Sequence, residues 1–395
     1  MTLSEFRKFR VCDELNKRGI DAVIATLPEN IFYLTNGYES VVQSSLLRGE
    51  LAVMYIPQTD KLVYIACYAE EPSIMEFAGE NVEIYTYSTG FSFEKGDDSS
   101  FTERVLSDKY KGYANSAEAW EKAIKNNLPA GKKIAVDESR VFPNIYFDIM
   151  DRISEYDILS GTDVFMHIRR IKHPEEIKLI EKAAEIASES LDLTLKNFKE
   201  GLSAKDLEYL YNIELAKKGA VPHFCVITEN KRAAFSDTSN SFNPIMEGSM
   251  IRFDFGCIYK GFNADLARTA YVGIPDEKLK TYFNAVKLGT EAGIELAGPG
   301  VTTGDVFDKV VEVVRQNGIP HYVRHHTGHG IGLEIYDMPS ITYKSNFVME
   351  ENQTFCIEAP YYELGWGGVQ QEDTIHITGD GSRYLDKTSR DLILL

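Results

Sequence analysis

The sequence lacks the features that mark secreted and membrane-spanning proteins. Its five cysteines are odd in number, scattered and free of any C-x-x-C pair, which favours small buried thiols in a reducing compartment over disulfides or a thiolate metal site. No apolar run approaches the roughly 20 residues that cross a bilayer, and residues 1–20 lack the apolar centre of a signal segment. We therefore expect a cytoplasmic protein with no membrane partner.

Positive charge is also scarce. The chain carries 42 Lys and Arg against 60 Asp and Glu, which gives a net charge of −18, and basic clusters such as Arg169-Arg170 are only dipeptides. This excess of negative charge would repel a phosphate backbone. We therefore expect no nucleic-acid partner.

Apolar residues are plentiful enough for a folded protein. The 395 residues are 44% hydrophobic and include 21 Phe and 22 Tyr, and a chain of this length buries roughly three quarters of its unfolded surface. Because single cores stop growing near roughly 250 to 300 residues, two domains are expected. The polar, basic segment from Asp163 to Pro174 places their boundary near residue 165.

The first part of the chain has the pattern of an α/β domain. Short apolar runs bounded by polar residues predict strands, and a charged segment with spaced apolar positions predicts a helix before them. The stretch Tyr85–Ser100 has no clean period and predicts a long loop. The expected helix covers Ser4–Lys17, and the expected strands cover Ala22–Ala25, Leu51–Ile56, Leu62–Cys67 and Lys133–Asp137.

The second part begins with two predicted helices, at Pro174–Lys199 and Ala204–Lys217, and contains an internal echo. The pattern from Gly201 through Ser203 to Asp206 and Gly219 recurs 99 residues later, from Gly300 through Thr302 to Asp305 and Gly318. In each copy a hydroxyl residue can cap a helix with an acid at its third position, and a glycine follows the helix. Two capped helices that arose by chance are one explanation. The other is a duplicated half-domain, with two similar α/β units about a pseudo-twofold axis and a cleft between them.

Four strands predicted after these helices carry acidic residues. Met250–Phe255 and Phe262–Val272 are expected to form an antiparallel hairpin that brings Asp254 and Asp265 onto one face. Salt bridges to Arg252 and Arg268 are an alternative role for these aspartates.

Further candidates for the same site follow along the chain. His329 lies among three glycines, which allow a ligand or a neighbouring backbone to approach closely. Glu358 and Glu372 lie on the predicted strands Gln353–Ala359 and Glu372–Thr378. Four converging buried carboxylates would repel one another, and two divalent cations would supply the missing charge of +4.

With these motifs the sequence resembles the creatinase, prolidase and aminopeptidase P family of metallohydrolases. Residues 18–22, 28–35 and 171–177 resemble the start of that family's N-terminal domain and its inter-domain junction. The resemblance implies an α+β fold, in which residues 1–165 form a creatinase-like N-terminal α/β domain and residues 166–395 a pita-bread catalytic domain. It also implies five metal ligands, Asp254, Asp265, His329, Glu358 and Glu372.

The implied ligand set indicates the metal and the chemistry. Carboxylate oxygens with one imidazole suit manganese, iron, cobalt or zinc, and manganese is our first choice. Two such ions lower the pKa of a bridging water and polarise the carbonyl that it attacks. The resemblance implies Glu358 as the general base and His325 as a group that holds the substrate or the developing oxyanion. A hydrogen-bonded structural histidine is the alternative role for His325.

The sequence departs from the family pattern at three places that bear on the substrate. Tyr336 stands where family members have a histidine and Gln370 where they tend to have an arginine; Asp237 lies in a segment that lacks another usual histidine. The Tyr336 hydroxyl can still donate a hydrogen bond, so Tyr336 is expected to be catalytic, whereas Gln370 cannot supply a positive charge. Asp237 and Asp337 could bind an amine of the substrate.

The function expected from the resemblance is that of a metal-dependent Xaa-Pro peptidase, of the aminopeptidase P or prolidase type, acting on short peptides. The alternative is a creatinase-like hydrolase of a non-peptide carbon-nitrogen bond in a small metabolite. A third possibility, an inactive binding module, is opposed by the five intact ligands. The resemblance also implies a homodimer.

Overall fold

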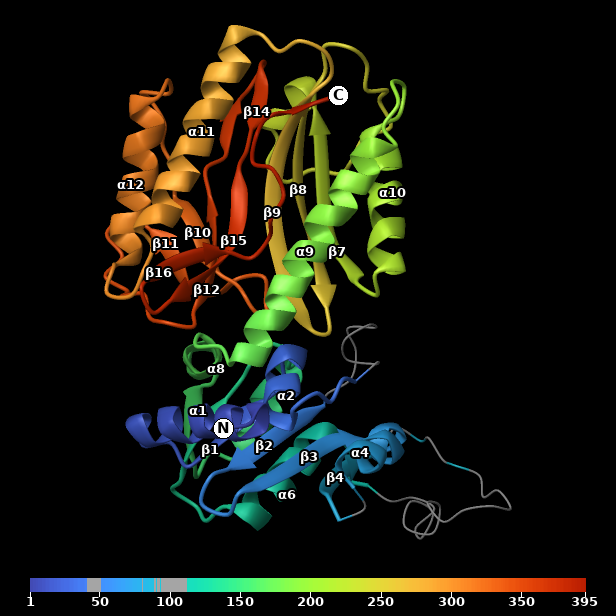
Figure 1. Cartoon of the computed structure of the whole chain (residues 1–395). Helices are drawn as coiled ribbons and strands as arrows, with labels where there is room; N and C mark the ends of the chain where they lie inside the picture. The colour runs from blue at the N-terminus through green and yellow to red at the C-terminus, as the bar shows by residue number, and fades with distance from the viewer. Residues whose placement is uncertain (41–50, 80, 89, 91–92, 94–111) are drawn as a thin grey trace. The chain divides into compact units, whose positions relative to one another are not determined.

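The computed structural model of the chain describes residues 1–40, 51–79, 81–88, 90, 93 and 112–395 (Figure 1). These residues form two compact units, Met1–Ile168 and Arg169–Leu395. Each unit has its own β-sheet and its own hydrophobic core. None of the described helices combines the length and apolar character that a bilayer span needs.

The first unit contains a mixed six-stranded sheet in the order β4-β3-β2-β1-β5-β6. The central strand β1 pairs antiparallel with β2 and parallel with β5. In chain order the described elements of this unit are α1 (Leu3–Arg18), β1 (Ala22–Ala25), α2 (Pro28–Thr35), β2 (Ala52–Ile56), β3 (Lys61–Cys67), the 3-10 helix η1 (Tyr68–Glu70), α4 (Glu71–Ala78), β4 (Glu83–Tyr87), α6 (Ser116–Asn127), β5 (Lys133–Val136), α7 (Pro143–Arg152), β6 (Asp157–Ser160) and α8 (Thr162–Arg169).

Local sequence explains where these elements begin and end. Thr2 and Glu5 form a capping box at the start of α1, and Gly19 ends the helix in the left-handed conformation, at φ 64°. All four residues of β1 are buried, as its continuous apolar run requires. The helix and strands predicted for this part are confirmed. The predicted loop at Tyr85–Ser100 is wrong in its first three residues, which belong to β4, and most of its remainder lies outside the described residues.

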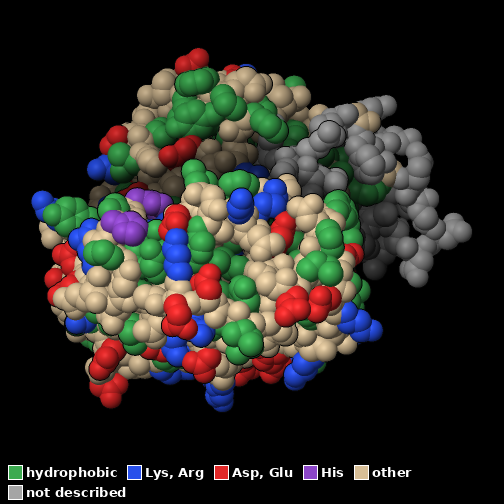
Figure 2. Space-filling model, turned by 90° about the horizontal axis from the view of Figure 1, so that it is seen from above, with side chains coloured by type: hydrophobic (Ala, Val, Ile, Leu, Met, Phe, Trp, Pro, Cys, Tyr) green, Lys and Arg blue, Asp and Glu red, His purple; other side chains and the backbone are tan. Residues whose placement is uncertain are grey.

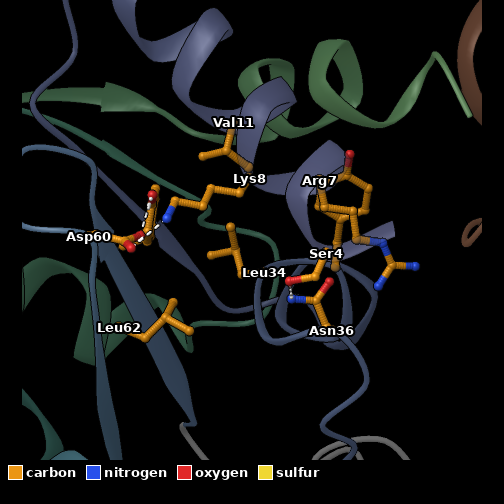
Figure 3. Close-up of a pocket in the computed structure, with 10 residues that line it drawn as sticks. Ser4, Arg7, Lys8, Val11, Leu34, Asn36, Asp60 and Leu62 are labelled. Carbon is orange, nitrogen blue, oxygen red and sulfur yellow. Dashed lines mark hydrogen bonds and ion pairs between the residues drawn. The ribbon is translucent and has the colours of Figure 1, made fainter. Parts of the chain in front are cut away.

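A cavity of about 280 Å³ lies in the first unit beside α1 (Figure 3). Val11, Leu34 and Leu62 form its apolar wall, and Lys8 and Asp60 form an ion pair across one side. No residue predicted for the catalytic site lines this cavity.

The second unit is built on a nine-stranded sheet, in which β11-β10-β12-β15-β9-β8-β7 form the main path. β16 pairs with β15, and β17 pairs with β9. The described elements are α9 (Pro174–Lys196), α10 (Ala204–Lys217), β7 (Val221–Glu229), the 3-10 helix η2 (Asn230–Ala234), β8 (Met250–Tyr259), β9 (Phe262–Tyr271), α11 (Glu277–Leu296), α12 (Thr303–Gln316), β10 (His326–Gly330), β11 (Asp337–Thr342), β12 (Thr354–Glu358), β13 (Tyr361–Glu363), β14 (Gly367–Val369), β15 (Glu372–Thr378), β16 (Gly381–Tyr384) and β17 (Ile393–Leu394).

The second unit repeats one arrangement of elements. α9 and α10 precede β7, β8 and β9, and α11 and α12 precede β10, β11, β12 and β15 (Figure 1). Ser203 and Thr302 both begin their helices with a complete capping box, and both also form an isolated bridge to a later residue. Gly219 and Gly318 follow those helices with positive φ angles. The two expected capping boxes are therefore confirmed, and they lie at equivalent places in the two halves.

The surface seen in Figure 2 carries acidic and basic side chains interspersed with apolar ones. Some ion pairs among the described residues join surface side chains that are close in sequence, such as Lys217 with Glu214 and Lys280 with Glu277. Exposed pairs of this kind contribute little to stability. The interactions that position the site lie instead inside the sheet of the second unit.

Candidate active site

The hairpin of β8 and β9 places two of the predicted acids on one face. Asp254 pairs with Ala267 and Gly256 pairs with Asp265 in an unbroken antiparallel register, so the two aspartates lie one pleat apart. Gly256 must be small because an added Cβ would lie 2.2 Å from the carbonyl oxygen of Ala264. The predicted hairpin and its shared carboxylate face are confirmed.

The predicted histidine lies on β10, against β12. His329 pairs with Cys356, and the preceding Gly328 pairs with Ile357. Gly328 has a φ of +145°, and a Cβ at this position would lie 2.1 Å from the carbonyl oxygen of Cys356. The glycine therefore permits the close approach of β10 to β12 that carries His329 into the site.

The two predicted glutamates lie opposite each other on neighbouring strands. Glu358 on β12 pairs directly with Glu372 on β15. Glu372 is also the residue through which β15 pairs with β9, opposite Ala267. The junction between the two halves of the sheet therefore passes through the site.

All five predicted metal ligands line one cavity of about 560 Å³ in the second unit. His329 Nε2 lies 3.6 Å from Asp265 Oδ2 and 3.9 Å from Glu372 Oε1. One potential ligand atom from each of Asp265, His329, Cys356 and Glu372 lies within 4.8 Å of the others. Residues more than a hundred positions apart in the sequence thus meet at one point.

The site concentrates negative charge in a buried place. Burial and neighbouring carboxylates raise the pKa values of Asp265 and Glu372 well above the usual range. Burial also raises the pKa of Asp254 to about 6, although Arg252 opposes the shift. Burial acts on Glu358 in the same direction, but the hydrogen bond from His326 lowers its pKa below the usual value. Without a counter-charge the four carboxylates cannot all be ionised near neutral pH.

The donor set fits divalent cations. Among the described residues, neither Asp265 Oδ1 nor His329 Nε2 has a hydrogen-bond partner, although both atoms are buried. His329 Nδ1 donates to the carbonyl oxygen of Gly330 at 3.0 Å, which leaves a lone pair on Nε2. Unpartnered buried atoms of this kind are costly in a folded protein unless an ion or water contacts them.

Cys356 belongs to the same cluster but has the character of a neutral thiol. Burial raises its pKa well above the usual value. Its Sγ lies 3.7 Å from the carbonyl oxygen of Asp265, to which it donates. A protonated thiol is a poor metal ligand, so Cys356 is consistent with the small buried residue that the sequence predicted.

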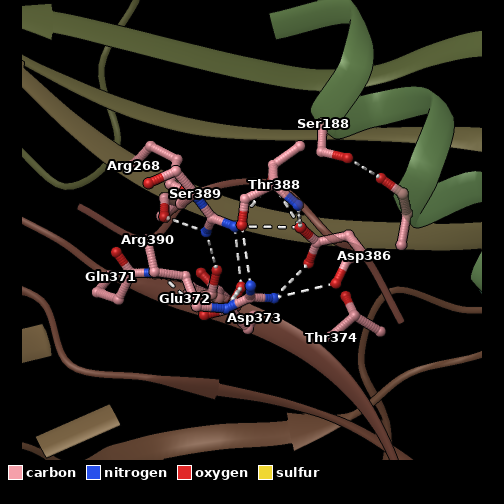
Figure 4. Close-up of polar contacts among 12 residues, drawn as sticks. Ser188, Arg268, Gln371, Glu372, Asp373, Thr374, Asp386, Thr388, Ser389 and Arg390 are labelled. Carbon is pink, nitrogen blue, oxygen red and sulfur yellow. Dashed lines mark hydrogen bonds and ion pairs between the residues drawn. The ribbon is translucent and has the colours of Figure 1, made fainter. Parts of the chain in front are cut away.

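The two arginines weighed as alternative partners of the aspartates behave differently. Arg252 Nη1 lies 3.3 Å from Asp254 Oδ2, so this contact exists beside the proposed metal role. Arg268 pairs with neither predicted aspartate ligand. It lies in a separate buried network that holds the chain after β16 (Figure 4), where its contacts are Asp373 at 2.9 Å and Asp386 at 3.4 Å.

The residues predicted to contact substrate are divided between two places. His325, Tyr336 and Asp237 line the cavity, and the Tyr336 ring lies 4.1 Å from the His329 ring, measured between centroids. Asp337 does not line it. Asp337 is buried and paired with Arg169 at 2.9 Å and Lys172 at 3.5 Å, so the expectation that it could bind an amine is wrong.

Among the cavity residues that were not predicted from sequence, three contact the predicted acids or one another. His326 Nε2 donates to Glu358 Oε1 at 2.7 Å, and Arg324 Nη2 lies 3.8 Å from Glu358 Oε2. The Tyr362 ring lies beneath the guanidinium groups of both Arg252 and Arg324, at 5.1 Å and 5.7 Å. In the sequence, only the position of Arg324 and His326 on either side of His325 pointed to their presence in the cavity. Spacing alone does not show which of these side chains turns toward the cavity.

Comparison with known proteins identifies the family of both parts of the chain. The family model described as metallopeptidase family M24 matches residues 178–379, and the model described as the creatinase/prolidase N-terminal domain matches residues 7–171. A protein named Xaa-Pro dipeptidase from Pyrococcus horikoshii is 29% identical over 388 residues, which is 97% of this chain and 97% of that protein. A putative dipeptidase, YkvY, from Bacillus subtilis is 25% identical over 98% of this chain and 99% of its own length.

Solved structures share the fold. A recombinant prolidase from Thermococcus sibiricus superposes with a TM-score of 0.84 at 23% identity, covering 100% of this chain and 98% of that one. An Xaa-Pro dipeptidase from Bacillus anthracis gives a TM-score of 0.82 at 23% identity, covering 99% and 100%. The creatinase-type first unit and the pita-bread second unit expected from the sequence are therefore confirmed as the fold.

Proposed function

Because the chain belongs to metallopeptidase family M24, we propose that it is a metal-dependent peptidase that cleaves the bond before proline in short peptides. The observation that carries the proposal is the convergence of Asp254, Asp265, His329, Glu358 and Glu372 in one cavity. The names of the full-length relatives, Xaa-Pro dipeptidase among them, support the substrate class.

The donor set suits two divalent ions, with manganese the first choice and cobalt, zinc or iron as alternatives. When bound by these five residues, the ions would lower the pKa of water and polarise the scissile carbonyl. The remaining steps belong to the side chains of the cavity. Glu358 accepts the proton of the attacking water and passes it to the leaving amine, while His326 orients the Glu358 carboxylate.

The substrate is held by groups at the wall of the cavity. His325 and the Tyr336 hydroxyl can donate hydrogen bonds to the carbonyl oxygen as its negative charge develops. Asp237 and Arg324 both line the cavity and carry opposite charges, so a short zwitterionic peptide finds a partner for each of its ends. These groups favour a substrate that carries both charges over an uncharged one.

Three further expectations belong to this proposal. The catalytic part extends from about residue 166, after an N-terminal domain, in agreement with the compact units. The enzyme acts as a homodimer in the cytoplasm. Sedimentation of the purified protein tests the dimer, and fractionation of the native cells tests the location.

Hydrolysis by metal-stripped protein, before and after addition of manganese, tests the activity. The panel contains Xaa-Pro dipeptides, longer Xaa-Pro peptides, non-proline dipeptides and creatine. We expect manganese to restore release of the residue before proline, and Glu358→Gln to abolish it. If proline peptides are not cleaved while the protein holds stoichiometric metal, the proposal is wrong, and cleavage of creatine would identify the alternative class.

A further inference from the structure

An arginine lies among the carboxylates of the site although position 370, where family members tend to have an arginine, is a glutamine. Arg252 is on β8, two residues before Asp254 and therefore on the same face of the strand. Its side chain is fully buried. The guanidinium Nη1 lies 3.3 Å from Asp254 Oδ2, and Nη2 donates to the carbonyl oxygens of Phe235 at 2.8 Å and Ser236 at 2.9 Å.

Gln370 connects this arginine to both halves of the site. Its Oε1 accepts a hydrogen bond from Arg252 Nη1 at 2.7 Å, and its Nε2 donates to Asp254 Oδ2 and Glu372 Oε2, each at 3.2 Å. Because a guanidinium can only donate and an ionised carboxylate can only accept, this is the amide orientation that satisfies all three neighbours. The side chain of Gln370 is buried, so water does not offer an alternative set of partners.

Arg252 and Gln370 contact only one oxygen of each of these two carboxylates. The contacts to Asp254 reach Oδ2, and the contact to Glu372 reaches Oε2. The second oxygen of Glu372, Oε1, is the one that lies 3.9 Å from His329 Nε2. Glu372 is therefore held through Oε2 while its Oε1 faces the imidazole, and Asp254 is held through Oδ2.

We propose that Arg252 and Gln370 form a positioning pair that orients Asp254 and Glu372 for the cations and supplies the positive charge that Gln370 alone lacks. The pair also spans the two halves of the sheet, since Arg252 belongs to β8 and Gln370 precedes β15. This proposal rests on the proposed metal-dependent function, but it is tested by metal affinity, which does not require the substrate to be known.

An exchange of the two residues provides the test. Arg252→Gln, Gln370→Arg and the double variant Arg252→Gln/Gln370→Arg are compared with the unchanged protein. The double variant retains one guanidinium and one amide between the same carboxylates, because the two groups already face each other at 2.7 Å. Manganese affinity of the metal-stripped full chain is measured by titration calorimetry, together with thermal unfolding, kcat and KM for a proline dipeptide.

We expect each single variant to weaken manganese binding by at least tenfold and to lower kcat more than it raises KM. The double variant is expected to recover affinity to within about threefold of the unchanged protein. Arg383→Gln is the matched control. Arg383 lies on β16, which neighbours β15 outside the cavity, and its guanidinium pairs with Glu181 at 2.7 Å. Its manganese affinity should stay within twofold.

Two results would overturn the proposal that Arg252 and Gln370 act as a positioning pair. Unchanged manganese affinity in Arg252→Gln, with a lower unfolding temperature, would show that Arg252 only anchors the carbonyls of residues 235 and 236. A double variant that binds manganese no better than the single variants would show that the two residues do not act together. If Arg252→Gln does not fold, Gln370→Leu removes the amide contacts and leaves that anchor; unchanged affinity there also overturns the proposal. Failure of the unchanged protein to cleave proline peptides would instead contradict the proposed function.

Discussion

Individual side chains around Glu358 determine whether the site can move a proton. Burial alone would raise the pKa of Glu358, yet His326, Arg324 and His329 together lower it. Asp254, Asp265 and Glu372 show the opposite shift. Glu358 is therefore the carboxylate of the cluster that is most readily ionised, which suits a group that must first accept a proton.

Removal of His326 should move the acidic limb of the activity profile. In His326→Leu the hydrogen bond that lowers the pKa of Glu358 is lost, so the pKa rises and Glu358 is protonated at higher pH. The acidic limb of kcat/KM is expected to shift upward by about one pH unit or less, as for the loss of one charge-assisted hydrogen bond. His223→Leu, at a cavity histidine bonded to Asn263 and not to Glu358, is the control. A limb that stays in place would contradict this role of His326.

Tyr336→Phe separates the ring of Tyr336 from its hydroxyl. The ring contact with His329 remains, whereas the proposed donor to the developing oxyanion is removed. We expect kcat/KM to fall by roughly 10 to 100-fold, with an effect mainly on kcat, because a donor used in the transition state is lost. Metal content measured in the same samples should not change. Loss of metal together with activity would indicate a structural role instead.

Sequence reasoning identified the five residues that converge in the cavity better than it identified their neighbours. Asp254, Asp265, Glu358 and Glu372 lie on apolar strands whose alternation shows which residues share a face. Arg252 was considered only as a salt-bridge partner, because its second contact comes from Gln370, more than a hundred residues later. His326 could not be distinguished from His325, since the register of β10 shifts between His326 and His329.

Among the elements, the strands that carry the predicted acids were predicted, whereas β4, β7 and the glycine-rich β10 were not. The bounds expected for β8, β9, β12 and β15 agree with the structure to within a few residues. β10 has the sequence HTGHG, which has neither alternation nor β-branched apolar residues, so its identity as a strand depends on pairing with β12. Tertiary contact, and not local preference, makes this segment a strand.

Gly328→Ala should show how much the close approach of β10 to β12 contributes to the stability of the fold and to metal binding. The added Cβ would lie 2.1 Å from the carbonyl oxygen of Cys356 at a φ of +145°, so the strands must separate. We expect the free energy of unfolding to fall by about 3 kcal/mol or more, depending on how far the strain is relieved. We also expect a loss of bound metal.

Gly300→Ala is the control for Gly328→Ala. Gly300 also has a positive φ, of +89°, but a Cβ there meets no atom within 4 Å. Its unfolding temperature should fall much less, by an amount that reflects backbone strain alone. Equal losses in the two variants, measured by thermal unfolding, would show that the contact with β12 is unimportant.

For the complete chain, metal and protons should compete for the same carboxylates. Burial raises the pKa of Asp254 from 3.8 to about 6 in the metal-free protein, so below that pH a proton must leave before an ion binds. Binding to the folded state alone raises its stability. Manganese is therefore expected to raise the unfolding temperature of the stripped protein more at pH 7.5 than at pH 5.

Differential scanning calorimetry of the stripped protein, with and without manganese at both pH values, measures this difference. Magnesium at the same concentration controls for ionic strength, because it retains its water and binds imidazole poorly. A manganese effect that is equal at the two pH values would show that the buried carboxylates do not take up protons in the metal-free state.

The junction at Glu372 and Ala267 has a consequence for the origin of the catalytic unit. One half of the sheet provides Asp254 and Asp265, and the other provides His329, Glu358 and Glu372. Neither half carries the full set of proposed ligands. If the repeated helices and strands descend from one duplicated gene segment, the ancestral segment could have assembled this chemistry only by associating with a second copy. Gene fusion would then have made permanent a partnership on which catalysis already depended.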